Sequence, residues 1–396
     1  MTLLSRWGRD ISLSATLAGV IATVISFSGP LVIVFQAAAG LGPDRTESWI
    51  WAIAIGSGLL GIGLSVRYRV PVVIAWSAPG SALLVSQLPG LAFEVAVGAY
   101  VVANLIVLTV GLTGAFDKIV ARLPSAITAA MLAGILLRFI VGMADAVGSA
   151  PILALIMIGV YFSVRLWSPR YALVAVVFAG GLVAASTGLL EGAAPSFAVT
   201  VPVWTTPRFE WQAVASIAVP LAVMSLSGQF LPGFAVLRAA GYDRPESRPV
   251  IASSAIGSIL LAPFGCHGLN LAAFTAAICL GPEAHKDRGR RYIAGVSGGL
   301  AYLVFGVFAG AVMGLFALLP PALIAVLAGL ALFPVVAASL AEAVEVSRTR
   351  DAAVVTFAVS ASGLTFLGLG AAFWGLILGL AIHSLMALHA VRAREG

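Results

Sequence analysis

The chain has 396 residues, of which 61% are apolar and 10% are charged, and its formal net charge is +6. About a quarter of the residues in a typical soluble domain are charged, so this composition excludes a water-facing globular surface and indicates an integral membrane protein. A membrane-spanning helix needs about 20 apolar residues, so the chain has room for at most about 14 to 16 spans and none for a soluble catalytic domain.

Fourteen apolar segments, separated by charges, prolines and glycines, are predicted to cross the membrane. In chain order they are 11–40, 47–66, 71–86, 92–113, 124–143, 150–167, 171–190, 212–237, 249–262, 264–280, 292–313, 320–341, 353–367 and 370–390. The third and the tenth are short and are interrupted by Gly and Pro. The prediction is therefore an all-α membrane protein with two irregular spans.

The basic residues test this order of spans, because Lys and Arg collect in cytoplasmic loops. With the N-terminus in the cytoplasm, 19 of the 22 basic residues fall in cytoplasmic segments, which leaves Arg45 and Arg208 outside and Arg138 within a span. An even number of spans with both termini in the cytoplasm follows. Since the positive charge lies between the spans, it does not indicate a nucleic-acid partner.

The longest outer segment, 191–211, lies near the middle of the chain and is interpreted as an extracytoplasmic connector between two halves of seven spans. An odd number of spans makes the second half start from the opposite side of the membrane, so related halves form an inverted repeat. The tetrapeptide SFSG at 26–29 in the first span has a counterpart, SLSG, at 225–228 in the eighth. The two interrupted spans are also the third of each half, and such pairs point to the central site of a transporter.

The third span is predicted to begin as extended chain and to become helical near its middle. Residues 71–76 are rich in β-branched side chains, and Pro79 restricts the residue before it and suits the first turn of a helix. Ser77 is the predicted N-cap, with Ala78 and Gly80 in the first turn. This helix start lies near the bilayer midplane, where irregular backbone is tolerated only if it is buried in protein or lines a cavity.

The tenth span has the same order. Its extended piece contains Gly265, His267, Gly268 and Leu269, and its helix is predicted to start at about Leu271 with Asn270 as the N-cap. Because the third span runs outward and the tenth inward, the two helix N-termini face each other at mid-membrane. Their positive dipole ends and free N–H groups predict a site for an anion, most simply a carboxylate.

Three side chains in the third, eighth and tenth spans are candidates for contact with the ligand. Gln229, which follows the repeated tetrapeptide, can donate to a carboxylate, and an interhelical packing bond is the alternative. His267 can bind the substrate or carry a proton, although a lone buried His is often structural. Trp76 can flank an aromatic ligand or simply be packed.

Three motifs resemble those of the benzoate/proton symporters, the BenE family: IAWSAPGSALL at 74–84, SGQFLPGFAVLRAAGYD at 227–243 and APFGCHGLNLAAFTAAICLGPEAHKD at 262–287. The fourteen-segment layout extends the resemblance over essentially the whole chain. The resemblance implies the fold of the nucleobase/ascorbate transporters and anion exchangers, with the substrate between the third and tenth helices. It also implies a bacterial inner membrane location in contact with lipid, and a homodimer as a candidate assembly.

The same resemblance divides the chain into two domains. Spans 1–4 and 8–11, at 1–113 and 212–319, correspond to a core domain, and spans 5–7 and 12–14, at 114–190 and 320–396, correspond to a gate domain. Related nucleobase carriers place acidic residues on spans 8 and 10, where this chain offers Gln229, His267 and Asn270. The absence of those acids suits an anionic substrate. The resemblance thus implies import of benzoate or a similar aromatic carboxylate with a proton, carried by His267 or by the substrate's own carboxyl.

Two other functions stay open on the sequence alone. A uniporter or channel for small organic anions would use the same site but would show flux without accumulation. An intramembrane enzyme would need a motif such as H-E-x-x-H, paired intramembrane carboxylates or an acidic metal cluster, and the sequence contains none of these. No cofactor or metal is therefore predicted, and no P-loop for ATP-driven pumping is present.

Overall fold

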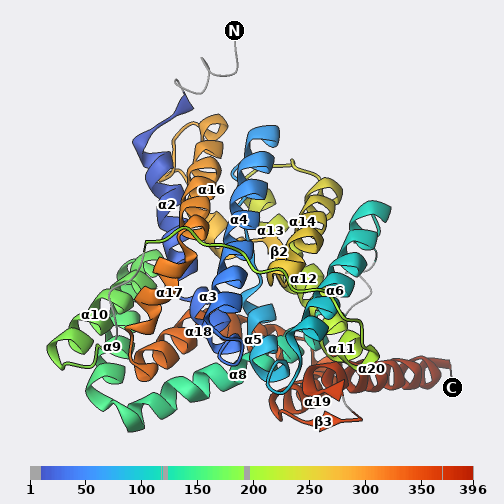
Figure 1. The fold of residues 1–396 in the computed structure, drawn as a ribbon. Helices are drawn as coiled ribbons and strands as arrows, with labels where there is room; N and C mark the ends of the chain where they lie inside the picture. Colours follow the sequence, from blue (N-terminus) through green and yellow to red (C-terminus); the bar gives the residue numbers. More distant parts are fainter. Residues whose placement is uncertain (1–9, 117, 119–123, 191–196, 368, 396) are drawn as a thin grey trace.

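A computed structural model describes residues 10–116, 118, 124–190, 197–367 and 369–395 (Figure 1). Arg6, Arg9 and Arg122, which belong to predicted cytoplasmic segments, and residues 191–196 of the predicted connector lie outside the described residues. The described chain is mainly helical and contains two small sheets, one formed by β1 and β2 and the other by β3 and β4.

The first half contains eight α-helices and one strand within the described residues: α2 (Leu13–Ser28), α3 (Pro30–Ala37), α4 (Pro43–Tyr68), β1 (Ile74–Trp76), α5 (Ala78–Gln87), α6 (Phe93–Thr113), α8 (Ser125–Ser149), α9 (Pro151–Trp167) and α10 (Ala172–Ser186), with a 3-10 turn at Pro169–Tyr171. The eighth predicted span is one long helical segment with two π-helical stretches: α11 (Trp211–Ala213), η2 (Val214–Ala218), α12 (Val219–Ser225), η3 (Leu226–Phe230) and α13 (Leu231–Ala239).

The rest of the second half is again helical: α14 (Ser247–Leu261), β2 (Leu269–Leu271), α15 (Ala273–Leu280), α16 (Tyr292–Val307), α17 (Ala309–Ala317), α18 (Pro321–Glu345), α19 (Arg350–Ala361), β3 (Thr365–Phe366), β4 (Leu369–Gly370) and α20 (Ala371–Glu395). Three 3-10 turns lie between these elements, at Ala262–Phe264, Arg288–Arg290 and Ser347–Thr349.

Seven helices of the described chain are long and apolar enough to cross a membrane, and an eighth span is formed if α16 and α17, which meet at an angle of 74°, are counted together. Three shorter apolar helices, Pro151–Trp167, Ala172–Ser186 and Ala371–Met386, lie between or after them. The chain is therefore a multi-pass membrane protein. Each of the fourteen predicted segments contains helix, but the count of fourteen spans stays a prediction.

Two predicted segments are more broken than expected. The segment 11–40 contains two helices that meet at Gly29, because Pro30 starts α3 and cannot continue the hydrogen bonds of α2. The segment 353–367 is helical only to Ala361 and then enters the β3–β4 hairpin.

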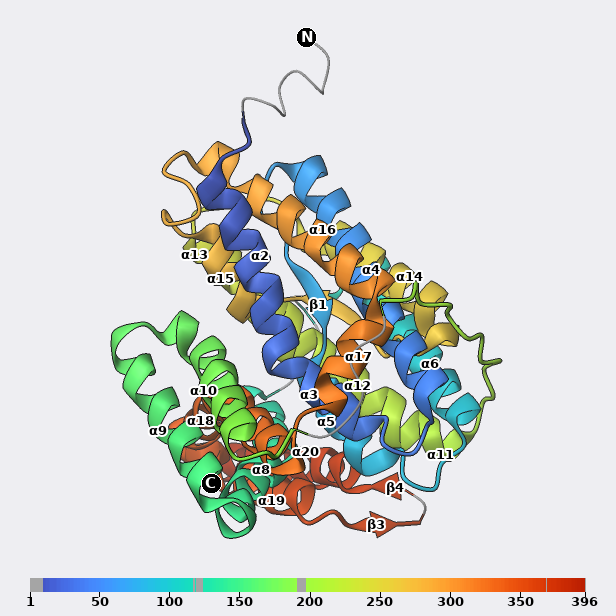
Figure 2. The ribbon, with the colours of Figure 1, turned by 60° about the vertical axis from the view of Figure 1, so that its left-hand side comes forward.

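The helices pack in two groups (Figure 2). In the first packing group, α16 lies against α4 and α2, and α14 lies against α6 and α4. In the second packing group, α8 lies against α18, α19 and α9, α10 lies against α9, and α20 lies against α19. The groups meet at Gly29, where an added Cβ would lie 2.7 Å from the Cβ of Ala331 in α18. This contact leaves no room for a larger side chain at Gly29.

Residues 197–210 of the connector run in an extended form across the first packing group (Figure 1). Its backbone N–H groups donate hydrogen bonds to four helical segments: from Thr200 to the Val307 carbonyl at 2.8 Å, from Val203 to Ser48 Oγ at 2.9 Å, from Thr205 to the Pro263 carbonyl at 2.7 Å and from Arg208 to the Glu94 carbonyl at 2.8 Å. The connector thus ties neighbouring helix ends of the first packing group together.

Candidate functional site

The extended pieces of the two interrupted segments pair with each other inside the first packing group. β1 and β2 are antiparallel, with Ile74 opposite Leu271, Ala75 opposite Asn270 and Trp76 opposite Leu269. All six residues are buried. Backbone away from water needs internal hydrogen-bond partners, so each strand satisfies the other where neither segment is helical. Figure 2 shows β1 among the helices of this group.

A serine of the helix that precedes each strand accepts a hydrogen bond from the backbone at or next to that strand. Ser65 of α4 accepts a hydrogen bond from the N–H of Val72 at 3.0 Å, and Ser258 of α14 accepts one from the N–H of Leu269 at 2.8 Å. Both serines are fully buried. The two halves therefore anchor their strands in the same way.

The start of α5 is capped as predicted. The Oγ of Ser77 accepts a hydrogen bond from the N–H of Gly80 at 2.9 Å, and Pro79 has no N–H to satisfy. Ser77 and Gly80 are buried, whereas Ala78 is half-buried. A Cβ on Gly80 would lie 2.9 Å from Leu221 Cδ2 of α12, so Gly80 permits close packing of the two helices.

The predicted start of α15 is wrong by two residues. Pairing with β1 keeps Asn270 and Leu271 in β2, so the N-cap is Ala272 and the helix begins at Ala273. Ala272 has no side-chain acceptor, and no side chain caps this helix. The N–H groups of residues 273–275 are consequently available at the end of the helix that attracts anions.

Asn270 lies in β2, two residues before the N-cap of α15. Only 2% of Asn270 is exposed, and its Nδ2 has no hydrogen-bond partner within the described residues. A Cβ built on Gly268 would lie 3.6 Å from this Nδ2, so the absence of a side chain at Gly268 leaves space beside it. A buried amide donor without a partner is costly unless a ligand or water accepts its hydrogen bond.

Four groups hold His267, three at its ring and one at its backbone. The Nε1–H of Trp49 in α4 donates to its Nδ1 at 3.1 Å, and its Nε2 lies 3.1 Å from the Ser77 carbonyl and 3.0 Å from Ser81 Oγ of α5. The Nδ2 of Asn104 in α6 donates to the backbone carbonyl of His267 at 3.3 Å. The structure therefore brings the predicted residues Ser77 and His267 into contact.

Gln229 lies in η3, a π-helical stretch that packs against β2 and α8. Its side chain is half-buried and makes no hydrogen bond to any of the described residues. An added Cβ on the adjacent Gly228 would contact Leu132 of α8 at 3.9 Å. π-helical turns are frequent at functional sites, and this one presents Gln229 where the two packing groups meet.

Gly265 lies away from the two helix starts and packs against α4. Its φ of +106° is unfavourable for residues with a side chain, and a Cβ there would lie 2.9 Å from the Cα of Trp49. Gly265 thus allows the chain before β2 to approach Trp49.

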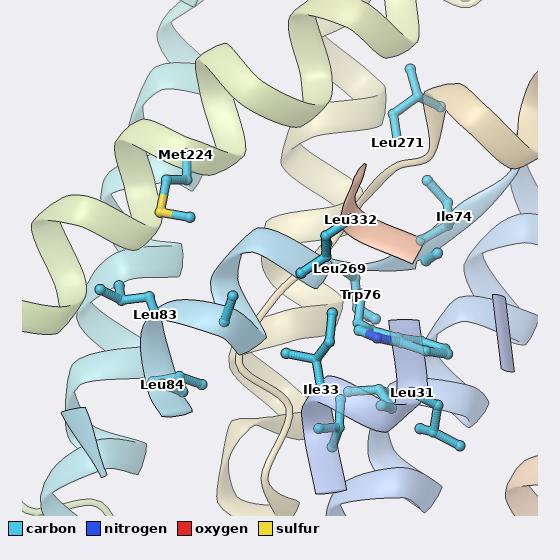
Figure 3. Close-up of a cluster of buried hydrophobic side chains, with 14 of the residues drawn as sticks. Leu31, Ile33, Ile74, Trp76, Leu83, Leu84, Met224, Leu269, Leu271 and Leu332 are labelled. Carbon is cyan, nitrogen blue, oxygen red and sulfur yellow. The ribbon is translucent and has the colours of Figure 1, made fainter. Parts of the chain in front are cut away.

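Trp76 is packed inside an apolar cluster. Its ring is edge-on to Phe27, with centroids 5.4 Å apart, and only 4% of the residue is exposed. Figure 3 shows it beside Leu31 and Ile33 of α3, with Leu332 of α18 in the same cluster. Leu269, its partner in the sheet, is buried as well.

The two helix starts contain no charged side chain. Residues 71–87, 226–233 and 263–281 include no Asp, Glu, Lys or Arg. Within the described residues, no three His, Cys, Asp or Glu side chains are close enough to hold a metal ion. What the arrangement offers a ligand is therefore backbone N–H groups and neutral amide donors, which suit an anion.

Four residues of this site were missed by the sequence reasoning: Trp49, Ser81, Asn104 and Ala272. Trp49 and Asn104 lie on spans that looked like regular packing helices, and Ser81 lies in the helical part of the third span. The contacts of all three to His267 bridge more than 160 positions of sequence. Local sequence contains no signal for such contacts.

The chain is similar to membrane transport proteins over nearly its whole length. The model of a family described as benzoate membrane transport protein, BenE, matches residues 9–385. A benzoate membrane transport protein of Acinetobacter baylyi is 42% identical over 97% of this chain and 98% of its own, and the inner membrane protein YdcO of Escherichia coli is 39% identical over 96% and 97%. The transmembrane domain of the cyanobacterial bicarbonate transporter BicA has a similar fold, with a TM-score of 0.59, 17% identity and coverage of 95% of this chain and 97% of that one.

Proposed function

Because the chain belongs to the BenE family of benzoate membrane transport proteins, we propose that it imports benzoate or a similar aromatic carboxylate together with a proton, as a secondary active transporter. The Acinetobacter relative is named a transport protein, and the solved structure of similar fold is a transporter, so the chain is a membrane transporter and not an enzyme. An experiment must test three parts of this proposal: the aromatic carboxylate as the substrate, the proton as the co-substrate, and the coupling of their transport.

The observation that carries the proposal is the uncapped start of α15. The first three backbone N–H groups of this helix have no side-chain cap, and the Nδ2 of Asn270, in the strand that leads into the helix, has no hydrogen-bond partner within the described residues. The segment contains no acidic side chain. A carboxylate supplies acceptors for these donors and is favoured by the positive end of the helix. At α5, in contrast, Ser77 and Pro79 leave only the N–H of Ala78 without an intrahelical or capping partner.

We infer that the aromatic ring lies beside these donors, against small side chains. Ala78 at the start of α5 and Ala272 before α15 are half-buried, and Gln229 is half-buried opposite β2. The Gln229 amide is then in position to donate a second hydrogen bond to the carboxylate. The proposed binding set also contains Trp76, Ser77, Gly80, Gly268 and Leu269, which build the walls around the two helix starts. Gly265 and His267 support these walls from behind, through their contacts with Trp49 and Ser77.

We also propose the fourteen-span, inverted-repeat architecture with a core domain at 1–113 and 212–319 and a gate domain at 114–190 and 320–396. The paired strands, the matched serine anchors and the separation of the helices into two packing groups support it. Both termini are then cytoplasmic, and the E. coli relative, an inner membrane protein by name, supports a bacterial inner membrane location. A homodimer in the lipid bilayer is the proposed assembly.

Uptake of labelled benzoate into proteoliposomes tests the function. An inward proton gradient is expected to drive accumulation, and a protonophore is expected to abolish it. If no aromatic acid enters in a gradient-dependent way, the proposed function is wrong. Flux that equilibrates benzoate but never accumulates it would instead identify a uniporter or channel for organic anions.

A further inference from the structure

Both ring nitrogens of the buried His267 already have hydrogen-bond partners. Trp49 Nε1 lies 3.1 Å from Nδ1, and the Ser77 carbonyl lies 3.1 Å from Nε2. Ser81 Oγ lies 3.0 Å from the same Nε2 and donates its own hydrogen bond to the Ser77 carbonyl at 3.1 Å. Only 2% of His267 is exposed.

These partners determine where the imidazole proton is. An indole N–H can only donate, so Nδ1 must present its lone pair to Trp49. The proton of the neutral ring is then on Nε2, where the Ser77 carbonyl accepts it and Ser81 Oγ has a free lone pair. A second proton on Nδ1 would point at the Trp49 N–H and break this bond.

No charged partner near the ring compensates a positive charge within the described residues. The aromatic neighbours are Trp49 and Tyr100, with ring centroids 5.6 Å and 6.2 Å from the imidazole, and the preceding residue is the thiol Cys266. From α5 the ring faces Ser77 and Ser81, which do not titrate. At the ends of α4 and α6, Arg45 and Glu94 are paired with each other at 2.8 Å, and the Phe93 ring contacts both Arg45 and Trp49.

From this geometry we propose that Trp49 and His267 form a neutral clamp that positions the start of α5 against β2, and that His267 is not the proton carrier. The clamp joins α4, the N-cap residue of α5 and the chain that leads into β2, so it sets the spacing of the two helix starts. His267 acts as a positioning residue through Ser77, and Trp49 selects its tautomer. This inference rests on the proposed function, and it leaves the substrate carboxylate as the group that takes up the co-transported proton.

The variant His267→Gln separates the two roles. The Gln amide oxygen can accept from Trp49 and its amide N–H can donate to the Ser77 carbonyl, but an amide carries no proton at physiological pH. Proton-driven accumulation of benzoate and its pH profile are expected to persist, within about threefold of wild type, since the hydrogen bonds are replaced in kind. His267→Ala loses both bonds, and uptake is expected to fall about tenfold at every pH with an unchanged profile.

Trp49→Phe provides the matched control, because it removes the donor and keeps an aromatic ring. His267 can then accept a second proton on Nδ1, so uptake is expected to acquire an added loss at acid pH that the double variant with His267→Gln lacks. Loss of accumulation in His267→Gln, with benzoate exchange retained, would overturn the proposal and make His267 the carrier.

A spectroscopic measurement keeps this test independent of transport. Imidazole nitrogen shifts of the ¹⁵N-labelled full-length protein, with the His267 signals assigned by their absence in His267→Gln, are expected to report the neutral Nε2–H tautomer between about pH 5 and pH 8. An imidazolium, or the Nδ1–H tautomer, contradicts the clamp even if the protein transports no aromatic acid. Failure of the proposed function alone would leave these shifts as expected.

Discussion

The two interrupted segments are built alike up to the start of their helices, where they differ. Each has a strand anchored by one buried serine, Ser65 before β1 and Ser258 at β2. After β1 the helix start is capped by Ser77, whereas after β2 it follows the uncapped Ala272. The repeated architecture therefore positions two helix dipoles, and the capping residue determines which of them is free to hold an anion.

A side-chain cap on α15 is expected to have the largest effect on binding. Ala272→Asp provides a side-chain acceptor for the N–H of Thr275 and places a negative charge where the substrate carboxylate is proposed to bind. Benzoate affinity is expected to fall about 100-fold or more, because like charges in a dry site cost several kcal/mol. Isothermal titration calorimetry on purified protein measures the loss.

A neutral cap shows whether binding weakens because the cap competes for the α15 N–H groups or because its charge repels the substrate carboxylate. Ala272→Asn is expected to raise unfolding stability by about 1 kcal/mol while weakening benzoate binding less than Asp does. Wild-type affinity in both variants would show that the α15 donors do not bind substrate.

Removal of the unpartnered amide is expected to have the next largest effect. Asn270→Ala deletes a donor that has no protein acceptor, so binding should weaken by about 1 to 3 kcal/mol, while the free energy of unfolding of the empty protein should stay within about 0.5 kcal/mol. The matched control is Asn104→Ala, whose amide bonds two backbone carbonyls and whose loss should lower stability. Equal stability losses in the two variants would contradict a ligand role for Asn270.

Ser77 and Asn270 show what the sequence could and could not predict. Ser77 was recognisable as a cap because Pro79 follows it at helix-start spacing, and both signals are local. Asn270 looked like a cap because helix-forming sequence follows it, but the pairing of β2 with β1 nearly 200 residues earlier kept it extended. Composition and charge likewise predicted a multi-pass membrane protein, whereas the π-helical turn at Gln229 depends on packing between helices. The break at Gly29 follows from Pro30, which is a local signal.

Loss of the α5 cap tests the other side of the comparison. Ser77→Ala removes the acceptor of the Gly80 N–H, so the free energy of unfolding should fall by about 1 kcal/mol. Because the protein itself provides partners for the N–H groups at the start of α5, this helix start is not expected to bind the carboxylate. Benzoate affinity should therefore change by no more than about threefold, much less than in Asn270→Ala. Thermal unfolding in detergent and calorimetry report the two quantities separately. A larger loss of affinity than in Asn270→Ala would place the carboxylate at α5 instead.

The smallest effect on affinity is expected at the two serine anchors, where the halves match. Ser65→Ala and Ser258→Ala each remove one acceptor of a buried backbone N–H, from Val72 and from Leu269, so both should lower unfolding stability by a similar amount, about 1 to 3 kcal/mol. Neither serine touches a helix start, so benzoate affinity in the folded fraction should stay at the wild-type value. If Ser258→Ala weakens binding and Ser65→Ala does not, the difference between the two segments in anion binding arises at the strands and not at the capping residues.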